Sequence, residues 1–515
     1  MKKLNLIIAI LNGLLKYSDK EWEAIQSKLN KFEGEMLNNI LADPMVTDEN
    51  IASDVFNTHF KDIIYQRNRK TLSDKLTNEI LLFKPSKRKY NTIQRVQYKC
   101  EQLYVILKIL RGTEYTQLAK HIALYLIKRA EKYHFSEIRV GTNEYLVYYY
   151  SFIEPNKKSV DRCNEDLKVS MDVRAAEIFA ESNYNVLFSN FNTANLDKMM
   201  VFKQAINAKN KLDRYKSNAE NSLKFYTNYF SFCVLMHEGI EDYQVALDYA
   251  RQGYEYLLTL NFDHKRAKIV FLVHMTNCYL RLGFATEARQ TILESLKIQI
   301  EGENNWFASM WLLVQIELYQ NDYDKAAGYY KKIVNNKSFI NQPKYRQDQF
   351  NIGGAMLYYL FKSNRISKFQ CYNKNDFNRS LVGYENLDQK YTSSSIPILI
   401  INLLLELSNS NQKSVKRIID ELEQYCSSKV RTSNVNYRTN CFIKMLQCIP
   451  EGNFHPVAVT RKAENDLKRL QGVDFKISDE KTVLELIPYE RLWEMILDQL
   501  KTTKTLKNRR VIKQA

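Results

Sequence analysis

The feature that most constrains the fold is a helix–turn–helix unit that occurs three times in succession within residues 222–336. Each copy has an alanine at the same place in its second helix, namely Ala246, Ala288 and Ala326. Apolar residues follow each alanine at spacings of three and four, so they share one face of a helix. The alanine lets the two helices of a hairpin approach closely, because a larger side chain would hold the backbones apart. The stretch therefore predicts three helical hairpins packed one after another.

The second copy carries the residues that connect this unit to a known family. Tyr279, Gly283, Ala288 and Leu296 stand at the spacings of a tetratricopeptide repeat (TPR), and residues 222–336 resemble that family. The copies depart from it in length, because their alanines are 42 and 38 residues apart instead of about 34. The resemblance implies an all-α protein, a right-handed α-solenoid of TPR-like hairpins with non-repetitive helical regions at both ends.

The scarcity of glycine and proline agrees with a helical protein. Only 14 glycines and 8 prolines occur in 515 residues, so little interrupts the long periodic stretches. No segment alternates strongly enough between apolar and polar residues to predict a strand. We expect a helical N-terminal region over 1–90, degenerate hairpins over 91–221, the TPR-like repeat core over 222–363, a polar, flexible connector over 364–395, a C-terminal helical region over 396–500 and a disordered basic tail over 501–515.

Charge and cysteine usage narrow the class of protein. The formal net charge is +17 and the pI is near 9.2, which favours nucleic acid, an anionic membrane or an acidic partner. None of the 8 cysteines forms a C-x-x-C pair, so buried thiols in a reducing cytoplasm are expected rather than disulfides or zinc. The apolar run over 4–15 lacks a small-residue cleavage site and predicts an amphipathic helix, not a signal peptide. No other run is long and apolar enough to predict a membrane span.

The search for catalytic motifs yields one weak pattern. No phosphate-binding loop, dinucleotide fingerprint or H-E-x-x-H motif is present, so we expect no metal, no cofactor and no enzymatic activity. Arg129 and His134 form R-x4-H, which resembles the active-site motif of helical HEPN-type ribonucleases. That resemblance implies an imidazole that moves protons and a guanidinium that steadies a phosphoryl oxygen. The alternative is a solvated helix end, since about one such match is expected by chance in a chain this long.

In TPR arrays the first helix of each repeat lines a concave groove in which partner peptides lie. Matching by position gives eight candidates for this groove: Asn228, Ser231, Val273, Asn277, Arg281, Trp311, Gln315 and Tyr319. Asparagine and glutamine can hydrogen-bond an extended backbone, Arg281 can hold a carboxylate, and the aromatic residues supply apolar area. The alternative is that Val273 and Trp311 pack against neighbouring helices.

A second hypothesis uses the basic residues that follow the N-terminal region. The candidates for phosphate contacts are Lys84, Lys87, Arg88, Lys89, Arg95 and Lys99. Lysines on exposed helix faces also keep a long solenoid soluble, so this cluster has a plain explanation as well. The sequence thus favours a cytoplasmic scaffold or adaptor for a protein or peptide, which would regulate a separate effector enzyme. Nucleic-acid binding is the alternative, and a HEPN-like ribonuclease is the third hypothesis.

Overall fold

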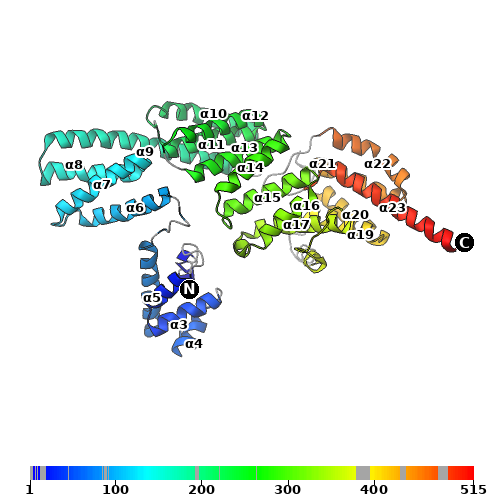
Figure 1. Ribbon diagram of the computed structural model, residues 1–515, viewed down its shortest axis with the longest axis horizontal. Helices are drawn as coiled ribbons and strands as arrows, with labels where there is room; N and C mark the ends of the chain where they lie inside the picture. The colour runs from blue at the N-terminus through cyan, green and yellow to red at the C-terminus, as the bar shows by residue number, and fades with distance from the viewer. Residues whose placement is uncertain are drawn as a thin grey trace. The chain divides into compact units, whose positions relative to one another are not determined.

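The computed structural model is helical throughout the part of the chain that it describes. The described residues are 4–514 without 6, 9, 12–18, 44–45, 84, 86–89, 91, 192–196, 220, 262–263, 379–394, 430–436 and 474–484. These residues form helices joined by turns, with no strand among them (Figure 1), which confirms the all-α prediction. The chain divides into two compact units, Met1–Arg174 and Ala175–Ala515, and the division falls within helix α9 (Lys157–Phe191).

The first unit contains two separate apolar cores. Its helices are α2 (Asp19–Gln26), α3 (Lys31–Ala42), α4 (Asp48–Phe56), α5 (Ile63–Leu81), α6 (Thr92–Leu110), α7 (Thr116–Tyr133) and α8 (Ser136–Tyr148), followed by a π-helical turn (Tyr149–Ile153) and the start of α9. One core joins the N-terminal residues to α3–α5, and the other joins α6–α9. Leu4, Ile7, Ile8 and Leu11 are buried in the first core, as the amphipathic pattern predicted.

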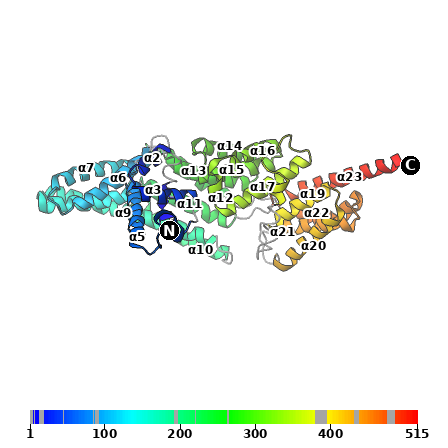
Figure 2. The ribbon, with the colours of Figure 1, turned by 90° about the horizontal axis from the view of Figure 1, so that it is seen from below.

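The second unit contains the three predicted hairpins. After α10 (Lys198–Tyr215), they are α11 (Leu223–Gly239) with α12 (Tyr243–Thr259), α13 (Lys265–Arg281) with α14 (Ala285–Ile298), and α15 (Asn304–Tyr319) with α16 (Tyr323–Val334). Each helix contacts the next along the chain, and α13 to α17 (Lys344–Lys362) follow one another in Figure 2. Ala246, Ala288 and Ala326 are completely buried. This run of hairpins is an α-solenoid, while its right-handed sense stays a prediction.

The last hairpin merges with the C-terminal helices in one large core. These helices are α19 (Ser395–Ser408), α20 (Gln412–Lys429), α21 (Tyr437–Glu451), α22 (Pro456–Gln471) and α23 (Tyr489–Gln514). The core extends from Trp306 in α15 to Leu500 in α23. Arg438 of α21 helps to close it by donating hydrogen bonds to Glu485 and Glu490 at 2.9 and 2.6 Å. The repeats and the C-terminal region are therefore not separated by exposed surface.

The connector and the tail stay predictions, and the described residues add two observations. The described half of the connector, residues 364–378, buries Ile366, Phe369, Tyr372 and Phe377 in the large core, so it is anchored there by apolar side chains. Residues 379–394 lie outside the described residues. Helix α23 also continues to Gln514, through most of the tail that we expected to lack regular structure. Among the helices described, none is both long and apolar enough to cross a membrane.

Candidate partner-binding surface

Seven of the eight predicted groove residues occupy equivalent positions on the first helices of the hairpins, and Asn228 lies outside these positions, two turns before Leu235, the α11 match of Asn277. Gly239, Arg281 and Tyr319 each end their helix and stand seven positions before the hairpin's alanine. Asn277 and Gln315 share the position one helical turn before Arg281 and Tyr319. Ser231, Val273 and Trp311 share the position one turn before that. We call this side of α11, α13 and α15 the first-helix surface. Helices α11 and α13 contact each other directly, so their portions of it are adjacent.

The α15 portion of the first-helix surface is core. Trp311 is 4% exposed, and its ring centroid lies 5.5 Å from that of Phe350 in α17. The ring covers Gly353, where an added Cβ would come within 2.4 Å of it. Gln315 is 6% exposed, and Ser231 of α11 is 3% exposed. These three side chains are buried, and Trp311 packs against the neighbouring helix α17.

Tyr319 is engaged by the C-terminal helix α23. The guanidinium of Arg491 lies over the Tyr319 ring, 5.4 Å from its centroid. Arg491 also donates to the backbone carbonyl of Tyr319 and, at 2.9 Å, to Oδ1 of Asn321 in the following turn. A partner that used Tyr319 would therefore have to share it with the chain's own α23.

The α11 and α13 portions keep polar groups within reach of solvent. Val273, Asn277 and Arg281 are half-buried and follow one face of α13. The side chain of Asn277 forms no hydrogen bond within the described residues. Asn228 of α11 donates through Nδ2 to the carbonyl of Lys224 in its own helix at 3.0 Å, which leaves its Oδ1 as an acceptor. The guanidinium of Arg281 lies 5.8 Å from the centroid of the Tyr243 ring.

A carboxylate that we did not predict lies between these two helices. Glu238, in the last turn of α11, has Oε1 at 3.7 Å from Nδ1 of His274 and at 3.8 Å from Sγ of Cys278, both in α13. Burial raises the pKa of Cys278, and the neighbouring carboxylate raises it further, so the thiol stays protonated. The only sequence signal for the Glu238–His274 contact is adjacency to positions already singled out. Glu238 directly precedes Gly239, the last residue of α11, and His274 directly follows the groove candidate Val273. The described residues of this surface thus carry amides, a guanidinium and a carboxylate.

The ribonuclease candidates lie in the first unit. His134 directly follows α7 as its C-terminal cap, in the left-handed region at φ 57°, which is the placement of the helix-end alternative. The Arg129 guanidinium lies 5.3 Å from the ring centroid of Tyr125, one turn earlier in the same helix. In the structure Arg129 packs near an aromatic ring and His134 caps a helix. A catalytic role for the pair stays a prediction.

The basic candidates fall partly outside the described residues. Lys84, Lys87, Arg88 and Lys89 lie outside them. Arg95 donates to Oγ1 of Thr92 at 3.2 Å, and Lys99 lies 5.6 Å from the centroid of the Tyr125 ring. Lys99 of α6, a candidate for phosphate contacts, and Arg129 of α7, a candidate of the ribonuclease hypothesis, therefore both lie near the Tyr125 ring. In the described portion of the chain, no group of three or more histidine, cysteine, aspartate or glutamate side chains is placed to hold a metal ion.

Comparisons with known proteins give no relative from which a function could be transferred. The chain matches no protein-family model, no curated protein and no solved structure.

Proposed function

We propose that this protein is a TPR-like scaffold that binds an extended segment of a protein partner along the α11 and α13 portions of the first-helix surface. The observation that carries this proposal is the pair of asparagines on neighbouring first helices. Asn277 has no hydrogen-bond partner among the described residues, and Asn228 keeps a free Oδ1. A side-chain amide both donates and accepts, so it can pair with the N–H and C=O of an extended peptide.

The neighbouring charges would set the direction and preference of the peptide. Arg281 offers a fork of donors to a carboxylate, while Glu238 offers an acceptor one hairpin away. A segment that spans the two helices would place an acidic residue near Arg281 and a basic residue near Glu238. The protein would then position or regulate a separate effector enzyme in the cytoplasm, without catalysing a reaction itself.

The test is recovery of the tagged full-length chain from its own cells, with and without nuclease, at low and at high salt. We expect one protein to stay bound through both treatments and to bind the purified chain directly. Asn277→Ala should weaken that direct binding about tenfold, the usual loss for one or two good hydrogen bonds. Gln290→Ala is the matched control, because Gln290 is exposed on the second helix α14 and should leave binding unchanged.

Two outcomes would count against the scaffold. Equal binding by the Asn277→Ala and wild-type chains would remove the first-helix surface from the interaction. Recovery of nucleic acid alone, released by salt, would replace the proposal with the alternative of backbone binding to nucleic acid.

A further inference from the structure

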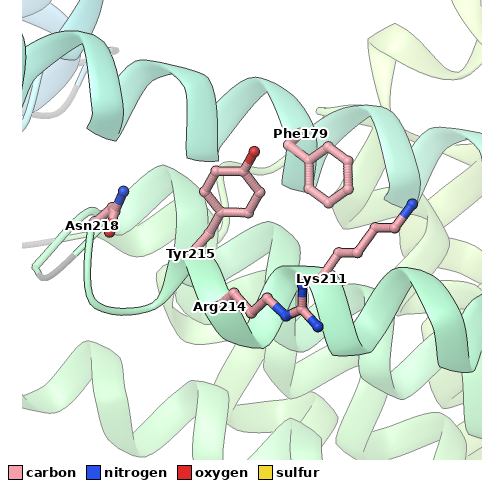
Figure 3. Close-up of a pocket in the computed structure, with 5 residues that line it drawn as sticks. All are labelled: Phe179, Lys211, Arg214, Tyr215 and Asn218. Carbon is pink, nitrogen blue, oxygen red and sulfur yellow. The ribbon is translucent and has the colours of Figure 1, made fainter.

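A small cavity lies between α9 and α10 in the second unit, away from the first-helix surface. Its volume is about 330 Å³, at the lower end of the range for small-molecule pockets. Phe179 of α9 lines one side, and Lys211, Arg214 and Tyr215 of α10 line the other, with Asn218 in the turn that follows α10 (Figure 3). The cavity therefore combines aromatic rings with cationic groups.

The two rings form a half-buried apolar wall. The centroids of Phe179 and Tyr215 are 5.2 Å apart, and the ring planes are tilted by 38° (Figure 3). Both side chains are only partly covered, so a planar group could lie against them. The Tyr215 hydroxyl makes no hydrogen bond within the described chain. Base–aromatic stacking is the usual way in which such a wall is used in proteins that bind single-stranded nucleic acid.

The two cations of the cavity have no acidic partner in the described part of the chain. Lys211 and Arg214 are exposed and three positions apart on α10, a spacing at which like charges repel. The one acidic residue of α10, Asp213, is already engaged by Lys209 at 2.9 Å and by Lys216 at 2.8 Å. An anion bound between Lys211 and Arg214 would relieve their repulsion.

Asp213 also accepts a third hydrogen bond, from a tyrosine hydroxyl. The Tyr229 hydroxyl of α11 donates to Oδ1 of Asp213 at 2.8 Å, so that carboxylate is shared by α11, Lys209 and Lys216. Asn218 accepts a hydrogen bond from Oγ of Ser217 at 3.1 Å through its Oδ1. Its Nδ2 is then free to donate to an oxygen of a ligand. Lys211, Arg214 and the Asn218 amide would therefore all donate hydrogen bonds to a ligand, and the Tyr215 hydroxyl can donate as well.

We propose that this cavity binds a nucleotide, with a phosphate held by Lys211 and Arg214 and the base lying against Phe179 and Tyr215. The nucleotide could be free or part of a single strand, since both present the same phosphate and ring. This proposal is independent of the scaffold function, because it uses neither α13 nor the asparagines.

The test measures binding of fluorescent single-stranded oligonucleotides and of AMP and ATP to the full-length chain by anisotropy and calorimetry. We expect Lys211→Ala to weaken binding about tenfold and to lower its dependence on salt. Lys203→Ala is the matched control, because it removes one exposed charge from the same helix outside the cavity. Phe179→Leu keeps an apolar side chain but removes the ring, and should weaken binding about fivefold or more.

The pattern of losses decides the proposal. Binding of free nucleotides identifies the nucleotide itself as ligand, and binding of oligonucleotides alone identifies a strand; either supports the site. Equal losses for Lys203→Ala and Lys211→Ala would overturn it by indicating general attraction to a basic helix. No binding of any probe, or binding unchanged in Phe179→Leu, would overturn it as well, provided that circular dichroism shows the variants folded.

Discussion

Helices α13 and α15 have the same place in successive hairpins, yet one borders solvent and the other is core. The matched residues are Val273 and Trp311, then Asn277 and Gln315. The two α13 side chains are half-buried, whereas those of α15 are 4% and 6% exposed. The difference arises from the helices that succeed each hairpin along the chain. The α15 hairpin is succeeded by α17 and the C-terminal core, and the α13 hairpin by another hairpin of the solenoid.

This contrast means that position within a repeat does not by itself determine whether a residue can face a partner. Helix α15 buries nearly every residue from Trp306 to Leu318, and its own sequence shows this, because apolar residues surround the helix. Helix α13 keeps a polar stripe. A helix that is apolar on all sides predicts burial on all sides, and that signal outweighs the match in position.

The largest expected effect separates the two helices by stability. Trp311→Ala removes a buried ring from between Phe350 and Gly353 and should cost about 3–5 kcal/mol of unfolding free energy. Val273→Ala at the matched position removes a partly exposed side chain and should cost about 1 kcal/mol. Urea denaturation followed by circular dichroism measures both values. Equal costs would mean that α15 is as open as α13.

A second prediction concerns the ion pair that joins the two hairpins. Nε of Arg289 in α14 lies 2.7 Å from Oε1 of Glu317 in α15, and the Glu317 side chain is 1% exposed. Arg289→Met would leave this carboxylate buried without its partner, at a cost of about 2–3 kcal/mol, below the usual range because Arg289 is partly exposed.

The matched control for this ion pair is Arg417→Met. Arg417 pairs with Glu421 on an exposed helix face, so its loss should cost about 0.5 kcal/mol or less. The double change Arg289→Met with Glu317→Leu should recover part of the stability, because an apolar pair replaces the buried charge. If Arg289→Met lowers the unfolding free energy no more than Arg417→Met does, the Glu317 carboxylate is solvated in the folded protein. Helix α15 would then not be a core helix.

The third prediction uses pH to test the junction before the first hairpin. Burial alone would raise the pKa of Asp213, but hydrogen bonds from Lys216, Lys209 and Tyr229 lower it to about 2. The pKa in the folded chain is thus below that in the unfolded chain, about 3.9. Its stabilising contribution is complete above about pH 4 and is lost as the pH falls through 2.

The measurement is the melting temperature between pH 5 and pH 2. Asp213→Asn should flatten the decrease in this interval, and Asp248→Asn should not, because Asp248 is half-exposed on α12. A chain with Asp213→Asn that loses stability as steeply as wild type would show that other carboxylates dominate the acid response.

The sequence predicted the three hairpins more accurately than it predicted the contacts made by residues of the first-helix surface. Ala246, Ala288 and Ala326 identified three helix pairs, because a small buried residue and a 3.6-residue period are local signals. The surface depends on contacts between distant segments. Arg491 covers Tyr319 from a helix 172 residues away, and no local pattern indicates this contact. The burial of Phe369 and Phe377 in the connector was not predicted for a similar reason, since these residues are scattered among polar ones and meet their core only in the folded chain.

The smallest expected effect on stability is also the sharpest test of the comparison. Asn277→Ala removes a side chain without a hydrogen bond in the described chain and should change the unfolding free energy by about 0.5 kcal/mol or less. Its effect should be on partner affinity instead. Gln315→Ala, at the matched position of α15, should destabilise the protein because it leaves a space in a packed core. Once folded at low temperature, that variant should bind the partner as wild type does. If both variants lose binding without losing stability, the α15 portion must open in solution, and the first-helix surface then extends across all three hairpins.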